Sequence, residues 1–170
     1  PLSAASLTGK IDCVRLLLEA GAAVNQADAE GRTPMLVACQ EGQIAIARLL
    51  LEASAAVGQA ADGGFTPLIV ACENGQHECV RLLLEAGAAP NQAKNDGATP
   101  LFAACYNGHL EIVRLLLEAS AAVGQAADGG FTPLIVACEQ GHLDCVRLLL
   151  EASAAVSQAK DDGATPLNIA

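Results

Sequence analysis

The segment TPLFAACYNGHLEIVRLLLEAS, from Thr99 to Ser120, is the clearest guide to the architecture, because related copies of it recur along the chain. Prolines that open these copies stand 33 residues apart, at Pro34, Pro67, Pro100, Pro133 and Pro166. The segment RLLLEA keeps the same step and begins at Arg15, Arg48, Arg81, Arg114 and Arg147. Two motifs locked to one period predict a single tandem array over residues 1–170, with repeats 1–33, 34–66, 67–99, 100–132 and 133–165 and a partial repeat 166–170.

Each period contains signals for two helices. Thr33 is suited to cap a helix through its hydroxyl, and Pro34 is suited to the first helical position, where its missing N–H costs nothing. This first helix should end near Gly42, and a longer second helix should follow from Ile44 and end near Ser54. The Asp-Gly-Gly connectors predict tight, hairpin-like turns with positive φ. One such unit cannot bury both helices alone, so stacked units should form an all-α solenoid.

Composition and charge exclude several classes of protein. Apolar residues make up 52% of the 170 residues, which argues against disorder, while aromatic residues make up only 2%. A net charge of -10 is opposite to that of a nucleic-acid-binding protein, and every apolar run is too short to span a membrane. Seven cysteines without paired metal-type spacing fit a reduced compartment, so the sequence predicts an intracellular protein, cytoplasmic or nuclear.

The recurring motifs resemble the ankyrin repeat: Thr-Pro-Leu-x-x-Ala, then Gly-His, then Val-Arg-Leu-Leu-Leu, then Gly-Ala-x-x-Asn. This resemblance covers the whole chain. It implies an ankyrin-repeat solenoid of antiparallel helix pairs joined by hairpin-like loops. It also implies a non-catalytic scaffold that binds a protein through the hairpin tips and the concave face of the first helices.

The chain departs from the ankyrin pattern at three positions of the repeat, although not at all three in every copy. The expected histidine after Thr-Pro-Leu is replaced, mostly by apolar residues such as Leu36 and Ile69, so a polar network between repeats is not expected there. The glycine after the second helix is kept at Gly21 and Gly87 but is serine at Ser54, Ser120 and Ser153, where we expect looser junctions. The acidic residue that often follows is alanine in all five copies.

A second symmetry has a period of 66 residues. Residues 48–73 are identical to residues 114–139, which indicates that a two-repeat unit was copied. The copying fits either a natural array or an engineered scaffold, and the retention of seven cysteines favours the natural one. Because neither end carries a polar capping repeat, an alternative function is a structural spacer in a longer array. End-to-end self-association through the uncapped termini is the related prediction.

Side chains with catalytic or ligating chemistry have simpler structural explanations. Four cysteines, Cys39, Cys72, Cys105 and Cys138, recur at one first-helix position and are expected to fill the core, although Cys72 could meet Cys79, or Cys138 meet Cys145, within a repeat. Two thiols alone do not make a zinc site, and no nucleophile, base and acid recur together. The sequence therefore predicts no catalytic residue, no metal and no cofactor.

Charge distribution supplies the candidate site. Ten acidic and three basic residues on the hairpins and first-helix ends account for seven of the ten excess negative charges, and three of the four aromatic residues lie there too. The predicted partner is a protein with a basic or mixed basic-apolar segment, and a partner Lys or Arg could stack on the aromatic rings. The candidate contact residues are Arg32, Gln40, Glu41, Asp62, Phe65, Glu73, Asn74, Asp96, Tyr106, Asn107, Asp128, Phe131, Glu139 and Gln140.

A modification hypothesis rests on the resemblance alone. Ankyrin repeats resemble the substrates of asparaginyl hydroxylases at the Asn of the Val-Asn turn, and Asn25 and Asn91 match this position. The acid that precedes it in those substrates is missing, since Ala23 and Ala89 stand there.

Overall fold

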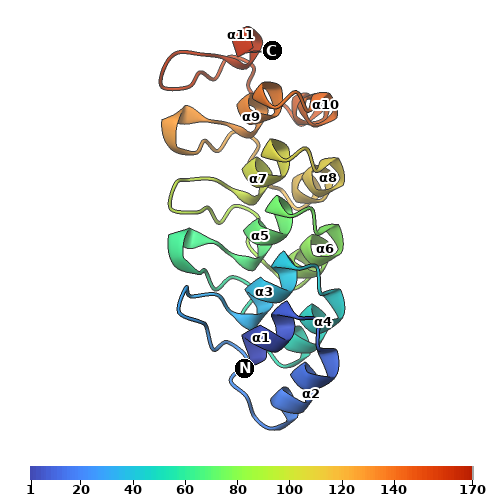
Figure 1. Cartoon of the computed structure of the whole chain (residues 1–170). Helices are drawn as coiled ribbons and strands as arrows, with labels where there is room; N and C mark the ends of the chain where they lie inside the picture. The colour runs from blue at the N-terminus through green and yellow to red at the C-terminus, as the bar shows by residue number, and fades with distance from the viewer. Residues whose placement is uncertain (170) are drawn as a thin grey trace. The chain divides into compact units, whose positions relative to one another are not determined.

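The computed structural model describes residues 1–169, and its regular structure is helical (Figure 1). The helices that open the repeats are α1 (Leu2–Leu7), α3 (Pro34–Gln40), α5 (Pro67–Glu73), α7 (Pro100–Tyr106), α9 (Pro133–Glu139) and α11 (Pro166–Ile169). The second helices are α2 (Ile11–Glu19), α4 (Ile44–Glu52), α6 (His77–Glu85), α8 (Leu110–Glu118) and α10 (Leu143–Glu151). Over residues 1–169 the β pairing is confined to one isolated bridge, between Ala127 and Phe131, so the all-α prediction is confirmed.

Contacts along the chain group it into two units, Pro1–Ala89 and Pro90–Ala170. In the first unit, α3 packs between α1 and α5, and α4 packs between α2 and α6. In the second unit, α9 packs between α7 and α11, and α8 packs against α10. Each second helix also packs against the first helix of its own repeat, so each unit has two layers of helices with the loops at one side (Figure 1).

The helix starts are those that the Thr-Pro pairs predict. Thr33 Oγ1 accepts a hydrogen bond from the Leu36 N–H at 3.2 Å, and its backbone is extended with ψ at 161°. Thr66, Thr99 and Thr132 form the same cap, with distances of 3.2, 3.1 and 3.2 Å. These threonines are buried, so the cap satisfies a hydroxyl and an N–H that are both shielded from water.

The serine junctions, which the sequence predicts to be looser, form the same closing hydrogen bonds as the glycine junctions. Ser54, Ser120 and Ser153 adopt φ values of 63°, 63° and 66°, in the left-handed region that the glycines occupy. The Ser54 and Ala55 N–H groups donate to the carbonyls of Leu51 and Leu50, both at 2.9 Å, as Gly87 and Ala88 do one repeat later. The two closing hydrogen bonds keep serine in the helix-ending turn, and the cost is backbone strain rather than a lost bond.

We expect Ser54→Gly to raise the free energy of unfolding. The substitution relieves a left-handed serine, and the gain should be about 1 kcal/mol after the entropy of glycine is subtracted. Urea denaturation followed by circular dichroism measures it. The matched control is Gly87→Ser, which should lose a similar amount because a Cβ there meets no atom within 4 Å and only the backbone φ of 86° opposes it. Equal stability of all three proteins would contradict the strain at Ser54.

The core lies between the layers and between neighbouring first helices. Leu36, Ile69 and Ile135, which stand where the ankyrin pattern has histidine, are all buried, so this position is apolar as predicted. Polar links between repeats arise elsewhere. The Gln76 side chain donates to the Gln40 carbonyl at 3.3 Å, and a ring nitrogen of His142 lies 3.2 Å from the Tyr106 carbonyl. These side chains therefore link the start of a second helix to the end of the first helix in the preceding repeat.

Candidate functional site

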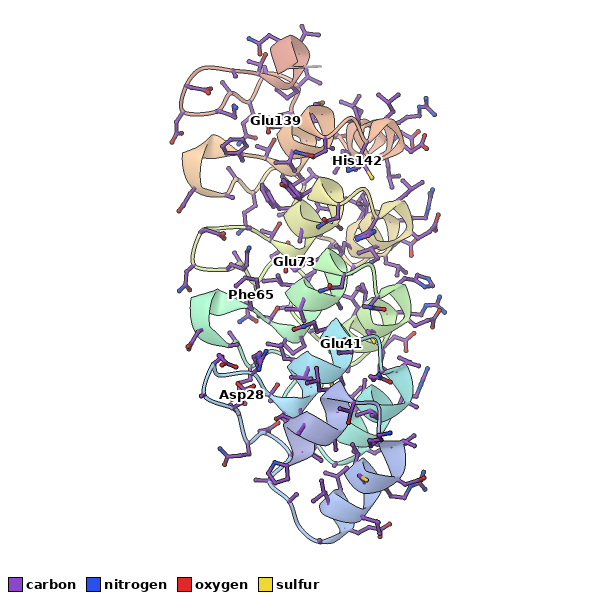
Figure 2. The ribbon with its side chains drawn as sticks, in the orientation of Figure 1. Asp28, Glu41, Phe65, Glu73, Glu139 and His142 are labelled. Carbon is purple, nitrogen blue, oxygen red and sulfur yellow. The ribbon has the colours of Figure 1, made fainter. Side chains whose placement is uncertain are left out.

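The first unit contains a hollow between the hairpins of the first two repeats and the helices α3 and α5. Its volume is about 250 Å³. Six of the seven candidate contact residues in this unit line it, namely Arg32, Gln40, Asp62, Phe65, Glu73 and Asn74. The seventh, Glu41, is exposed at the end of α3, and Figure 2 shows it on the same side as Glu73. The lining is completed by Glu30, Leu36, Ala61 and Val70, which were not among the residues predicted from the sequence.

The hollow combines an apolar floor with a charged rim. Leu36 and Val70 on α3 and α5 are buried and form part of the floor. Asp62, at the start of the turn η1 (Asp62–Gly64), and Glu30 are exposed at the rim. The backbone joins these two residues, because the Asp62 N–H donates to the Glu30 carbonyl at 3.2 Å. The arrangement therefore presents carboxylates beside an apolar surface.

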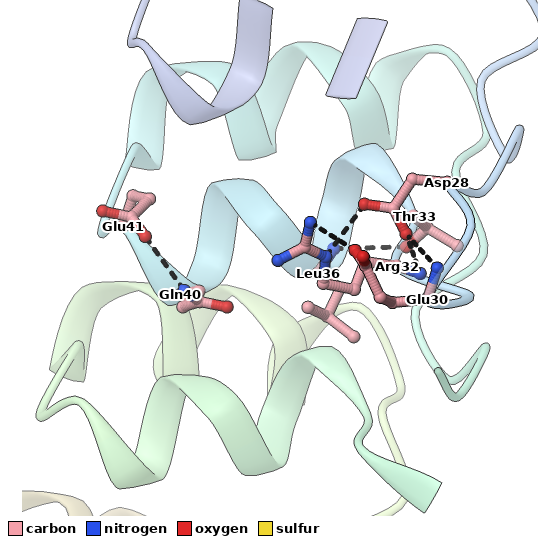
Figure 3. Close-up of polar contacts among 7 residues, drawn as sticks. All are labelled: Asp28, Glu30, Arg32, Thr33, Leu36, Gln40 and Glu41. Carbon is pink, nitrogen blue, oxygen red and sulfur yellow. Dashed lines mark hydrogen bonds and ion pairs between the residues drawn. The ribbon is translucent and has the colours of Figure 1, made fainter. Parts of the chain in front are cut away.

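Arg32 is held between two carboxylates at the hairpin of the first repeat. Its Nε lies 2.8 Å from Asp28 Oδ2, and its Nη2 lies 2.7 Å from Glu30 Oε2 (Figure 3). Asp28 Oδ1 also accepts the backbone N–H groups of Arg32 and Glu30, at 2.9 and 3.1 Å. Partial burial raises the pKa of the Asp28 carboxyl, but these hydrogen bonds outweigh it and leave the pKa below its ordinary value. The ionised Asp28 carboxylate therefore stabilises the hairpin through its contacts with Arg32 and the Glu30 backbone.

Because Asp28 is ionised in the fold, the effect of Asp28→Asn on stability should depend on pH. Because the folded-state pKa is lowered, the ionised carboxylate stabilises the fold above its unfolded pKa of about 3.9, and this contribution is lost as the pH falls through the folded value. The variant should therefore have a lower urea midpoint than the parent at pH 7, and the two midpoints should converge at about pH 2. If the difference between the two urea midpoints stays constant with pH, the charge of the Asp28 carboxylate does not stabilise the hairpin.

In the second unit, a lysine of the same chain contacts two of the candidate residues. Lys160 Nζ lies 3.0 Å from Glu139 Oε1, 3.5 Å from Asp162 Oδ2 and 4.5 Å from the centre of the Phe131 ring. Its side chain is only 12% exposed, and the hydrogen bond to Glu139 raises the pKa of the ammonium group. A partner cation could reach Phe131 and Glu139 only by displacing Lys160.

The other candidate residues of the second unit lie at its surface. Tyr106 is half exposed and stacks on Phe102 with a ring separation of 6.5 Å and an angle of 10° between the rings. Asp96 lies 3.4 Å from Lys94, and the Asn107 side chain donates to the Ala103 carbonyl of its own helix at 2.9 Å. Asp128 and Gln140 are exposed. Among the described residues of this surface, Tyr106 is therefore the aromatic residue whose side chain is exposed to solvent.

The two asparagines of the modification hypothesis link neighbouring repeats. Asn25 Oδ1 accepts the Ala56 N–H at 2.8 Å, and Asn91 Oδ1 accepts the Ala122 N–H at 2.8 Å. Gly58, Gly124 and Ser157 stand at the same position in the other repeats. Each asparagine side chain therefore links its repeat to the next one, and this link recurs every two repeats.

The cysteine contact that the structure forms differs from the pairing within a repeat that the sequence suggested. Cys79 on α6 shares a hydrogen bond with Cys39 on α3, which belongs to the preceding repeat. This hydrogen bond raises the pKa of Cys39 and lowers the pKa of Cys79. Burial raises the pKa of Cys72 far above its ordinary value, so its thiol stays protonated.

Comparison with known proteins agrees with this geometry. A sequence model of ankyrin repeats, three copies, matches residues 1–61, 55–126 and 120–170, which together span the chain. A comparison with curated proteins gives no match. Among the described residues, the structure contains no helix with the length and apolar character needed to cross a bilayer. Ankyrin repeats are generally protein-protein interaction modules. The stacked helix pairs, their Thr-Pro caps and this match along the whole length place the chain in the ankyrin repeat family, with an all-α ankyrin-repeat solenoid as its fold.

Proposed function

We propose that the chain is a non-catalytic scaffold that binds a basic or mixed basic-apolar protein segment across its hairpin tips and first helices. The observation that carries this proposal is the hollow of about 250 Å³ in the first unit, where carboxylates surround an apolar floor. Five acidic residues and one basic residue, a net charge of -4, lie on the hairpins and first-helix ends of this unit: Asp28, Glu30, Glu41, Asp62, Glu73 and Arg32. A segment with alternating basic and apolar side chains complements such a surface.

The size of the hollow favours a side chain of a protein over a cofactor. Pockets for drug-sized ligands and cofactors span about 300–1,000 Å³ and enclose most of the ligand. A smaller, charged hollow beside further exposed residues suits one anchoring side chain of an extended segment, with neighbouring side chains resting on the surface around it.

Lys160 supports the chemistry of the proposal. It places an ammonium group over Phe131 and against Glu139, and both residues belong to the copied 26-residue segment that also supplies Phe65 and Glu73. These side-chain types therefore bind a lysine of the chain itself, through a cation-π contact and a hydrogen-bonded ion pair.

Selection from a displayed library of random peptides tests the proposal, because it asks which side-chain chemistry the surface prefers. The whole chain is immobilised, and the selected peptides should be enriched in Lys or Arg interspersed with apolar residues. Their binding should weaken when Phe65, Tyr106 and Phe131 are all replaced by Ser in a chain whose circular dichroism is unchanged. Enrichment of acidic peptides, or equal binding by the triple variant, would overturn the proposed surface.

A further inference from the structure

The first unit contains a second concave site, beside the hollow described above. It has a volume of about 580 Å³ and is lined by residues of α1, α2, α3 and the hairpin of the first repeat, and we call it the apolar groove. Arg32 and Gln40 line both the apolar groove and the hollow, so the two sites adjoin each other. This arrangement follows from the packing, because α3 lies between α1 and α5 (Figure 1).

The apolar groove is the equivalent of the hollow in the preceding repeat. Lining residues of the two sites pair at a separation of 33 positions: Ser3 with Leu36, Leu7 with Gln40, and Arg32 with Phe65. Ser3 is smaller than Leu36, and Ala4, which also lines the groove, is smaller than the valine that the next repeat has at this position. These small side chains contribute to the larger volume of the groove.

Charge distinguishes the two sites. Of the described side chains that line the apolar groove, Asp28 and Arg32 carry charge, and they neutralise each other in an ion pair at 2.8 Å. Leu7 adds an apolar side chain that is 49% exposed. The described lining of the hollow has three carboxylates and one guanidinium, a net charge of -2: Glu30, Asp62, Glu73 and Arg32. The groove therefore suits an apolar side chain, and the hollow suits a cationic one.

The separation of the two sites limits the conformation of a segment that could occupy both. Neighbouring packed helices lie about 8–10 Å apart, so equivalent points of adjacent repeats have about this separation. In a polyproline II segment, side chains three positions apart lie on the same side and stand about 9 Å apart. Side chains on one face of a β-strand stand about 7 Å apart, and those seven positions apart in an α-helix stand about 10.5 Å apart. The polyproline II spacing therefore fits best.

We propose that a single partner segment in the polyproline II conformation occupies both sites, with an apolar side chain in the groove and a Lys or Arg three positions away in the hollow. This inference rests on the proposed function and specifies the ligand of its surface. The apolar side chain covers Leu7 and removes it from water, while the cation lies beside the carboxylates of Glu30 and Asp62. Two anchors at a fixed spacing give the surface its specificity.

Fluorescence anisotropy with labelled proline-rich peptides tests the spacing on the whole chain. Each peptide carries one leucine and one lysine in a proline host, which holds the polyproline II conformation. The two anchors stand two, three or four positions apart, in both orders, so that composition and charge are the same in all peptides. In the better of the two orders, we expect spacing three to bind at least about 10-fold more tightly than spacing two or four, because only then do both anchors bind.

A groove-filling variant tests the place of the apolar anchor. Ser3→Leu with Ala4→Val introduces the residues that the next repeat has as Leu36 and Val37. It should weaken the best peptide about 10-fold, and replacing the leucine of the peptide with alanine should then cause no further loss. Leu143→Ala is the matched control, because Leu143 is 72% exposed and lines neither site, and it should bind as the parent does. Circular dichroism checks that each variant keeps its helices.

Two kinds of failure are distinguishable. Equal affinity at all spacings would overturn the two-anchor segment, and so would a folded groove-filling variant that binds as the parent does. Absence of binding by every proline-rich peptide, when basic peptides from the random library do bind, would overturn it as well and leave the proposed function standing. If the peptides of neither set bind, the proposed function and this inference fail together.

Discussion

Replacing Leu116 with Ala is expected to lower the free energy of unfolding by about 2–5 kcal/mol. Leu116 on α8 is completely buried, and it shares one face of the helix with Ile112 and Val113. The truncation removes apolar contacts and leaves a cavity that the packed helices around it can close only in part. Urea denaturation followed by circular dichroism measures the loss.

The matched control is Leu143→Ala in the neighbouring second helix α10 of the same unit. Leu143 is 72% exposed, so its truncation removes little buried surface and should change the free energy of unfolding by less than about 0.5 kcal/mol. Equal effects of the two substitutions would contradict the burial pattern. Because repeats unfold as coupled neighbours, the whole transition should be compared as well as its midpoint.

Reversing the charge at the rim of the hollow, in a Glu30→Lys, Asp62→Lys double variant, is expected to weaken binding of the selected basic peptides strongly. Both residues line the hollow, and both belong to exposed parts of the hairpins. Like charges brought together across an interface cost several kcal/mol, and about 3 kcal/mol corresponds to a loss of roughly 150-fold in affinity. Fluorescence anisotropy with a labelled peptide measures this loss.

A second double variant distinguishes the effect of charge at the rim from the effect of the net charge of the chain. Glu19→Lys with Glu52→Lys changes the net charge by the same amount, but these exposed residues end the second helices α2 and α4. It should weaken binding only modestly, by an amount that disappears at high salt. Equal loss in the two double variants would mean that the peptides respond to overall charge, and the hollow would then have no special role.

Most of the fold could be predicted from the sequence because its signals are local. The Thr-Pro pairs determine both the start of the first helices and their capping hydrogen bonds, and the structure has both where the sequence puts them. The serines that replace glycine mark the limit of these local signals, because they adopt the same left-handed φ as the glycines. Sequence propensity describes only the cost of a left-handed serine. The two closing hydrogen bonds of the turn offset that cost, and they hold serine in this conformation.

The candidate site was predicted in part. Charge and aromatic content pointed to the hairpins and first-helix ends, and most of the candidate residues of the first unit do line one hollow. Leu36 and Val70 were missed because an apolar residue in a helix gives no sign of whether it faces the core or the floor of a hollow. Lys160 was missed as the neighbour of Phe131 and Glu139, which lie 29 and 21 residues earlier in the chain.

By itself, the sequence determined the repeat period, the two helices of each repeat, their caps and the acidic character of the hairpins, since each depends on neighbours within a few residues along the chain. Which side chains meet across repeats, in contrast, depends on how the repeats pack. This packing set Lys160 against Phe131 and Glu139, and it set Cys79 beside Cys39 rather than Cys72. The physical reason is that stacking brings together residues about one repeat apart, and the rotation and offset between stacked repeats are set by packing.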